Sequence, residues 1–437
     1  MSLTAVLFLL AFLVGISLAI VRHPIYGLLT YVGVFYVHPP SRWWGQGMLA
    51  DIRWSLIAAG VTILAILVRR SKFHTASVTR SGAFWGIVAF LLWLCVQSFW
   101  ALDVDAHIDL ISIYLKFVLV IVMICKCVES AEHLRMFLWA HVLGCAYLGW
   151  LAFTTYAGGR LDGIGGPGIN EANAAALQFV TGIIVAGSLF LGGSLKARGT
   201  VVAVIPFVVN ALVSTISRGG FLAAGIGGVI FNLFTPPKHR SVVRIMSILA
   251  LLLFALLTND MYWQRISTIK YKGEQVEGVD TGGGRLEILD AQWRMFRTHP
   301  LGCGHMCTTA LSPSYLDARF LSGGIARASH NTFMTMLVDH GLVGGAFYVA
   351  LLAWIFRSIR TVFGRIRRSD GFIATAVPAV AAVFAAITVG DMFAQYPKFE
   401  ARIWFMSLVI VLLHLSKDTS ASSPGNPVDT QPQGTSI

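Results

Sequence analysis

Long runs of apolar residues dominate this sequence and limit what it can fold into. Twelve of them approach or exceed the length at which a helix crosses about 30 Å of hydrocarbon. They lie near residues 3–21, 52–68, 83–100, 107–125, 133–156, 171–192, 200–216, 219–235, 241–258, 331–356, 372–392 and 400–416. A thirteenth run, 25–38, is shorter and contains two glycines and a terminal histidine. It predicts either a span or an interfacial or re-entrant segment.

The small number of charged residues excludes a soluble protein. Charged residues make up 12% of the chain and apolar residues 56%, whereas a soluble domain carries roughly 25% charged residues. We therefore expect an all-α polytopic membrane protein with about 12–13 transmembrane helices and one large periplasmic loop. The first run has no basic segment before it and no Ala-x-Ala end, so no cleavable signal peptide is expected.

The net charge of +12 indicates membrane orientation, not nucleic-acid binding. The basic residues gather in short connections between runs, which is typical of cytoplasmic loops. These connections lie at 69–80, 126–135, 196–198, 238–244 and 357–368. The alternate connections, at 101–106, 157–170, 217–218, 259–330 and 393–399, then lie on the outer side of the membrane. Arg160, Arg218, Arg285 and His330 all fall on that side.

The runs divide the chain into four regions. We expect an N-terminal membrane region at 1–258, a periplasmic loop at 259–329 that carries lid and active-site residues, C-terminal membrane helices at 330–416, and a disordered tail at 417–437. The tail is rich in Ser, Pro, Gly and Gln. Basic and acidic residues nearly balance in the loop, so an anion site there must use selected arginines.

The most distinctive motif is His330-Asn331, nine residues, Gly341, two residues, Gly344. On one continuous helix of about 100° per residue, the histidine and both glycines share a face. The glycines would let a second helix approach closely below the histidine. The alternative is that His330 caps the helix and the glycines serve packing alone.

Three arginines are candidates for holding an anion. Arg218 lies between two apolar runs, where a charge is costly without a partner. Arg160 lies in a glycine-rich loop, and Arg285 follows three glycines at the start of a predicted helix, Leu286–Phe296. Free N–H groups at a helix start favour anions. The arginines could instead pair with surface carboxylates or lipid phosphates. With His330 as a base, they predict a cationic pocket for phosphate.

Two other patterns carry less. Asp103 and Asp105 have a spacing found in metal-dependent glycosyltransferases, but two aspartates also open helices for dipole reasons, and no further carboxylates support a metal site. No metal or cofactor is therefore expected. Cys303 and Cys307 could pair if they face the periplasm, although a spacing of four on a helix is unfavourable for a disulfide.

Several motifs together resemble the bacterial O-antigen ligase and polymerase superfamily. They are the histidine-glycine motif, Ser217-Arg218-Gly219, Gly284-Arg285-Leu286, the run 299–304 (His-Pro-Leu-Gly-Cys-Gly) and the loop from Arg160 to Asn173. The N-terminal segments 21–27 and 36–39 are similar to those of ligases associated with exosortase systems. Of the two activities, the motif from His330 to Gly344 favours a ligase.

The resemblance implies a donor glycan on undecaprenyl diphosphate and an acceptor hydroxyl on lipid A–core. It implies a helical membrane glycosyltransferase-like fold in the bacterial inner membrane, with a periplasmic active site, membrane lipids around it and no metal. We expect His330 to deprotonate the acceptor, and Arg218, Arg285 and Arg160 to hold the diphosphate. Asn331, Gly341 and Gly344 would support the site, and a single displacement would invert the anomeric carbon.

Alternative functions remain at this point. A polymerase would use a similar donor but a second lipid-linked glycan as acceptor, and a protein O-glycosylation ligase would use a Ser or Thr hydroxyl. A transporter or flippase for a lipid-linked anion is the alternative from another class. It predicts charges near mid-membrane, whereas most of the arginines here collect at one face.

Overall fold

The computed structural model describes residues 2–69, 75–258, 285–321, 324–366, 371–395 and 397–421. Each of the thirteen apolar runs contains a helix, which confirms the all-α fold class. The helices are α1 (Leu3–Val21), α2 (Ile25–Val37), α3 (Trp54–Val68), α4 (Gly82–Gln97), α5 (Val104–Cys127), α6 (Ala131–Thr155), α7 (Ala172–Leu191), α8 (Leu195–Ser214), α9 (Arg218–Phe234), α10 (Arg240–Leu257), α15 (Gly341–Ile366), α16 (Ile373–Gly390) and α17 (Glu400–Ala421). The last of these ends beyond the predicted start of the tail.

Length and composition identify a multi-pass membrane protein. Within the described residues, eight helical segments are long and apolar enough to cross a membrane, and α3, α4 and α9 are shorter apolar helices. The segment Pro237–Leu257 includes α10, and only 6% of its apolar window is buried inside the protein. Since Leu251 and Leu256 on it are also exposed, this helix is suited to contact with lipid.

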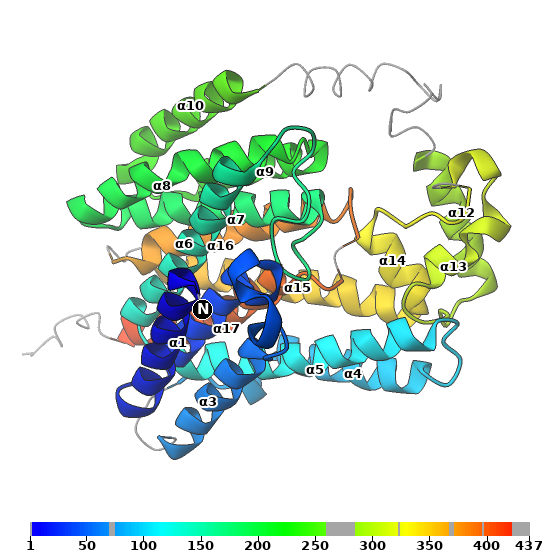
Figure 1. The fold of residues 1–437 in the computed structure, drawn as a ribbon, viewed down its shortest axis with the longest axis horizontal. Coiled ribbons are helices and arrows are strands. Elements are labelled where there is room, and N and C mark those ends of the chain that lie inside the picture. Colours follow the sequence, from blue (N-terminus) through cyan, green and yellow to red (C-terminus); the bar gives the residue numbers. More distant parts are fainter. Residues whose placement is uncertain are drawn as a thin grey trace, which may run out of the picture.

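Helices α7 and α16 form the centre of the bundle (Figure 1). They are 89% and 78% buried over their apolar windows, and α16 packs against both α7 and α9. Small residues make this packing possible. A Cβ atom on Gly227 of α9 would approach the Ala382 carbonyl oxygen of α16 to 3.3 Å. Such close backbone approach is the usual basis of helix association in lipid.

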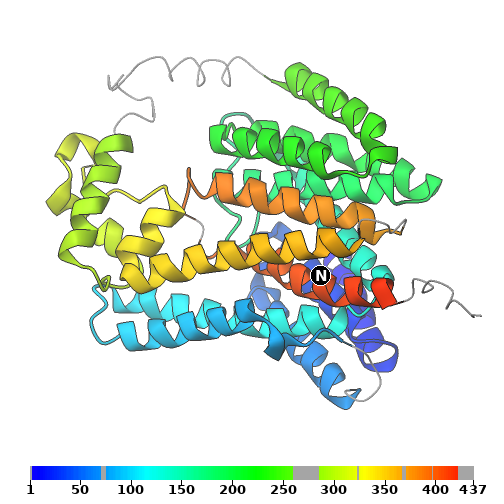
Figure 2. The ribbon, with the colours of Figure 1, turned by 180° about the vertical axis from the view of Figure 1, so that it is seen from behind.

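The described part of the long loop forms a small helical unit at one end of the bundle (Figures 1 and 2). It contains α12 (Arg285–Thr298), α13 (Cys307–Tyr315) and the short helix Ala318–Phe320, and it packs on α14 (Thr332–Asp339). The predicted helix Leu286–Phe296 is therefore confirmed as α12. The unit has its own buried core, which includes Met295 and Val338. Cys303 and Cys307 form a disulfide within this core.

The predicted continuous helix from His330 through Gly344 is wrong. Helix α14 ends at Asp339, and α15 begins at Gly341, whose φ is +67°. At this break, the Leu342 N–H donates to the Pro300 carbonyl (2.9 Å), and the Gly304 N–H donates to the Asp339 carbonyl (2.9 Å). The loop 300–304 thus occupies the helix break, and His330 and Gly341 do not share one helix face.

The two glycines of the motif serve this break. A Cβ atom on Gly341 would clash with the carbonyl carbon of Leu301, and one on Gly344 would clash with the carbonyl oxygen of Met336. Gly302 (φ +72°) lies against the same backbone from the other side. Helix α4 supports the break, because Gln97 donates to the carbonyls of Leu301 (3.2 Å) and Asp339 (2.9 Å). The glycines are therefore needed for backbone packing.

Candidate functional site

One cavity of about 130 Å³ brings together residues from five separate parts of the chain. It contains three of the four residues that the sequence predicts for chemistry: Arg160, Arg218 and His330. The full lining is Arg160, Glu171, Asn173, Leu177, Ile216, Ser217, Arg218, Gly219, Gly220, Ile288, Leu289, Arg327, Ser329, His330, Asn331, Gly390, Met392, Phe393 and Ala394. We call it the arginine cavity.

Four helices begin at the arginine cavity. Its lining includes residues from the starts of α7, α9, α12 and α14. Two of these starts are capped by side chains: Ser217 accepts from the Gly220 N–H (3.1 Å), and Asn331 accepts from the Met334 N–H (3.1 Å). Each helix start carries a partial positive charge and unpaired N–H groups. The backbone therefore favours an anion here before any side chain is counted.

Arg160 is positioned by Asn173 and by the end of α8. Its Nη2 donates to Asn173 Oδ1 (2.8 Å) and its Nε to the Thr215 carbonyl (3.3 Å). Ser217 also donates to Asn173 Oδ1 (2.9 Å). The alternative partner of Arg160, Asp162, instead accepts from the Ala172 N–H (2.7 Å) at the start of α7. Asn173 therefore links the Arg160 loop to the Arg218 motif, a role that the sequence analysis missed.

Arg218 is the first residue of α9. The two glycines after it let this end of α9 pack tightly. A Cβ atom on Gly219 would lie 2.8 Å from Phe393 Cβ, and one on Gly220 would lie 2.6 Å from Ala176 Cβ. The Ser-Arg-Gly-Gly sequence therefore places an arginine at a helix start that is wedged between α7 and the turn after α16.

His330 lies just before α14, in a left-handed backbone conformation (φ +48°). Both neighbours are held. Gln292 of α12 donates to Ser329 Oγ (2.6 Å), and Ser329 Oγ donates to the Asn331 carbonyl (2.8 Å). The Thr332 N–H donates to the Asp391 carbonyl (2.7 Å). The exposed histidine side chain is thus presented to the cavity from a fixed backbone.

Arg327 is a cavity residue that the sequence analysis missed. Its backbone N–H donates to Ser312 Oγ (2.7 Å), and its Nε is buried without a hydrogen-bond partner among the described residues. The described lining thus holds three arginines and one acid, Glu171, a balance of three minus one, or +2. In the sequence, the position of Arg327 three residues before His330 was the one signal that could have identified it.

Arg285 is the first residue of α12, and its side chain lies outside the described part of the structure. Ile288 and Leu289, one turn further along α12, line the cavity. Because residues three and four apart share a helix face, Arg285 stands on the same face as these two. It remains a predicted member of the site.

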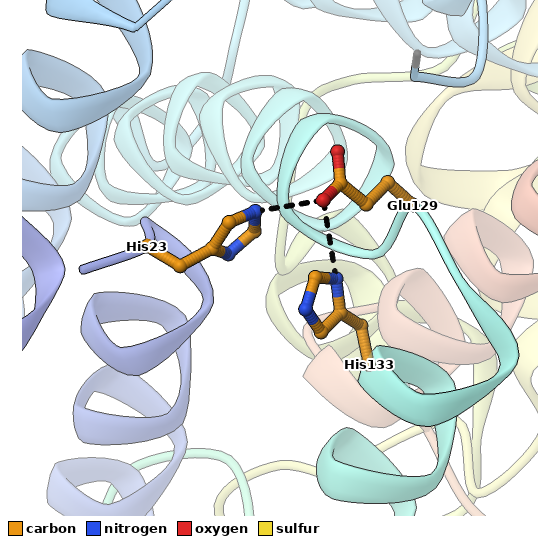
Figure 3. Close-up of side chains that lie close together, drawn as sticks. All are labelled: His23, Glu129 and His133. Carbon is orange, nitrogen blue, oxygen red and sulfur yellow. Dashed lines mark hydrogen bonds and ion pairs between the residues drawn. The ribbon is translucent and has the colours of Figure 1, made fainter. Parts of the chain in front are cut away.

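One cluster among the described residues has the composition of a metal site: His23, Glu129 and His133 (Figure 3). Its hydrogen bonds argue against that use. His23 Nδ1 accepts from the Ile25 N–H (3.0 Å), so the ring proton lies on Nε2, which faces Glu129 Oε1 (3.0 Å). A metal would need the lone pair of that same nitrogen. Burial, followed by His133 and Arg69, lowers the pKa of His23 to about 4. The cluster fits a hydrogen-bonded brace between α1–α2 and α5–α6 in which the His23 ring is neutral.

The aspartate pair has a structural explanation. Asp103 caps α5 by accepting from the Ala106 N–H (2.9 Å), and Asp105 lies in the first turn of that helix. Neither residue lines the arginine cavity. Both positions are those that a helix dipole favours for carboxylates.

Comparison with known proteins finds a family match over the part of the chain that contributes most of the arginine cavity. Residues 201–349 match the family model described as O-Antigen ligase. The match runs from α8 into α15 and contains Arg218, Arg327 and His330, while Arg160 lies before it. A search of curated proteins finds no match to the chain. The predicted resemblance to the O-antigen ligase and polymerase superfamily is thereby confirmed.

Proposed function

We propose, on the basis of this family match, that the protein is an O-antigen ligase. It transfers a glycan from undecaprenyl diphosphate to a sugar hydroxyl of lipid A–core. The observation that carries the proposal is the arginine cavity, which Arg160, Arg218 and Arg327 line together with His330 at the starts of four helices. A diphosphate joined to a sugar is an anion that such a cavity can hold beside a base.

The arginines and helix starts suit a diphosphate for two physical reasons. Guanidinium groups form paired, charge-assisted hydrogen bonds with phosphate oxygens. They also stay charged throughout the physiological pH range. As the leaving group departs, negative charge grows on the bridging oxygen. Fixed positive groups stabilise that charge more than they stabilise the bound donor, and removing one such group typically costs about 10²–10³ in rate.

The proposed reaction is one displacement at the anomeric carbon. His330 takes the proton of the acceptor hydroxyl, and the acceptor oxygen forms a bond to the carbon. The bond between that carbon and the diphosphate oxygen breaks, and its electron pair leaves with the diphosphate. The permanent charge of Arg160, Arg218 and Arg327 replaces a general acid. No metal takes part, and the anomeric configuration inverts.

The protein is a multi-pass membrane protein, and we place it in the bacterial inner membrane with the arginine cavity facing the periplasm. Support comes from the distribution of basic connections, which puts the sequences 157–170, 217–218 and 259–330 on one side. The donor would reach the cavity with its isoprenoid chain in the lipid.

The test is glycan transfer in vitro with purified protein, undecaprenyl-diphosphate glycan and lipid A–core. We expect His330→Ala to lower the rate by about 10²–10⁴, the usual contribution of a general base. His299→Ala is the matched control. That histidine lies in the same loop, contacts Thr298 and the Met295 carbonyl, and does not line the cavity. Its variant should keep wild-type activity.

Each outcome decides between functions. Transfer to lipid A–core that His330→Ala abolishes supports the ligase. Growth of the glycan on the lipid donor alone identifies a polymerase. Full activity in His330→Ala removes the histidine from the chemistry. Absence of both reactions in the wild type contradicts the proposal and favours a protein acceptor or transport.

A further inference from the structure

A second cavity, of about 400 Å³, adjoins the arginine cavity. It lies between the segment after α2, the end of α6 and the glycine-rich loop that carries Arg160. We call it the loop cavity. It is lined by Ser41, Arg42, Trp43, Leu151, Thr155, Tyr156, Ala157, Gly158, Arg160, Leu161, Asp162, Gly163 and Ile164. Its volume falls within the range of about 300–1,000 Å³ that is usual for small-molecule sites.

The walls of the loop cavity are built around a buried arginine. Arg42 is 7% exposed. Its Nε donates to the Val37 carbonyl (2.7 Å) and its Nη2 to the Ile164 carbonyl (3.0 Å), so it ties the segment after α2 to the Arg160 loop. Its guanidinium also lies over the Tyr147 ring. Arg42 thus holds the two walls together, and its donors are largely occupied by the protein.

The remaining lining has the chemistry of a sugar site. Trp43 is 76% exposed, unusually so for a tryptophan, and offers a flat apolar face at the rim. Hydroxyls of Ser41 and Thr155 and the carboxylate of Asp162 provide polar contacts. The lining contains Arg42, Arg160 and Asp162, which gives two minus one, or +1, and the guanidinium of Arg42 is already held by backbone carbonyls. A ligand with one apolar face and many hydroxyls matches this combination, and a pyranose ring has that form.

Arg160 connects the two cavities, because it lines both. Its guanidinium is fixed by Asn173 and Thr215, so the loop forms a shared wall between them. A glycan whose diphosphate or acceptor hydroxyl occupies the arginine cavity therefore has space for a further sugar on the other side of this residue.

We propose that the loop cavity binds a pyranose residue of one of the two glycan substrates, stacked on Trp43. The identity of these substrates rests on the proposed function, but binding itself does not. The competing explanation is that Trp43 only anchors the protein at the membrane interface, where tryptophans are enriched.

The first experiment measures binding without catalysis. Purified protein is titrated by calorimetry with two soluble probes. One is the core oligosaccharide freed from lipid A, and the other is the donor glycan freed from its carrier. We expect one probe to bind the wild type and to bind Trp43→Ala about tenfold more weakly, which corresponds to about 1.4 kcal/mol of stacking. Trp43→Phe should restore part of the affinity.

Two further variants make the test specific. Thr155→Trp places a large side chain in the loop cavity and should abolish binding of the same probe. Trp85→Ala is the matched control, since Trp85 is 54% exposed on α4 and does not line the cavity. In the transfer assay, Trp43→Ala should raise KM for the matching substrate about tenfold and leave kcat within twofold.

The outcomes separate this proposal from the proposed function. Weaker binding of the core probe assigns the cavity to the acceptor, and weaker binding of the carrier-free glycan assigns it to the donor. Binding that persists although the wild type transfers nothing would contradict the ligase but keep the sugar site. Equal affinities in wild type, Trp43→Ala and Thr155→Trp, or no binding of either probe to the wild type, would overturn the sugar site.

Discussion

At the residue scale, Arg327 shows how a residue of the arginine cavity can escape notice in sequence. The sequence between residues 259 and 329 contains eight basic residues, of which Arg327 is one, and seven acidic residues that nearly balance them. Apart from its position three residues before His330, only the fold distinguishes Arg327, because the 324–331 segment leads into α14 and carries this residue into the arginine cavity. Its buried Nε lacks a hydrogen-bond partner within the described structure, and a phosphate oxygen would supply one.

We predict that Arg327→Ala lowers kcat/KM for the lipid-linked donor by about 10², the usual effect of removing one positive group from a developing anion. The measurement is in vitro transfer at varied donor concentration. Arg319→Ala is the matched control, because Arg319 belongs to the same part of the chain and lies 3.4 Å from Asp317 on an exposed surface. Equal losses of kcat/KM in both variants would mean that Arg327 acts only through the overall positive charge of this part of the chain.

Three residues of the arginine cavity were predictable from different signals. Arg218 stands out between two apolar runs, where a charge without a partner is costly, Arg160 lies in a glycine-rich loop, and His330 opens the motif that ends at Gly344. Asn173 and Trp43 carry no such signal, since a polar residue early in a helix and a surface tryptophan are both ordinary. Their roles depend on contacts with residues far away in sequence, such as Asn173 with Ser217.

At the element scale, the break between α14 and α15 was the main feature that the sequence did not predict. The run 331–356 is apolar along most of its length, but Asp339 and His340 followed by Gly341 interrupt it, which is a local sign of a helix end. Gly341 adopts a left-handed conformation there because the loop 300–304 fills the break with its backbone. A residue some forty positions earlier thus determines where the helix ends, and no local periodicity records such a contact.

We predict that Gly341→Ala strongly destabilises the protein. An added Cβ would clash with the backbone of Leu301 and Gly302, and a non-glycine residue at this φ adds strain of about 1–2 kcal/mol. Gly364→Ala, on the same helix α15, has no atom within 4 Å of the added Cβ and should be neutral or stabilising by about 1 kcal/mol. Thermal unfolding in detergent compares the two, and equal midpoints would contradict the proposed role of the break.

The apolar runs predicted the remaining elements well, because each helix that lies in lipid must be apolar along most of its length. Helix ends were set by short-range signals, such as Ser130, Ser194 and Ser217, whose side chains cap α6, α8 and α9. The loop helix α12 was also predictable from its spacing. The docking of the loop 300–304 at the break between α14 and α15 was not predictable in this way.

At the scale of the whole molecule, the two ends of the helix bundle differ. One end of the bundle carries the α12–α14 unit, where four helices start around the arginine cavity (Figure 1). Along the sequence, basic connections between helices, such as Lys196–Arg198, alternate with the connections that carry residues of the arginine cavity. The positive-inside pattern therefore predicts that the two sets face opposite compartments.

This orientation predicts which engineered cysteines a membrane-impermeant maleimide can reach. In a background with Cys95→Ser, Ile325→Cys should be labelled in intact spheroplasts, and Leu195→Cys only after permeabilisation. The two positions are matched in exposure, at 78% and 84%. Labelling of Leu195→Cys alone would invert the orientation and remove the arginine cavity from the periplasm.

The four helix starts at the arginine cavity also affect how the proposed reaction would end. Their positive charge attracts any diphosphate, and breaking the sugar bond leaves the carrier with an additional charged phosphate oxygen. The spent carrier is thus the better ligand of the two. We expect turnover to be limited by departure of the carrier, so that added undecaprenyl diphosphate competes with the donor. An enzyme that depends on such a cavity would need a second process, which removes or recycles the spent carrier, to keep working.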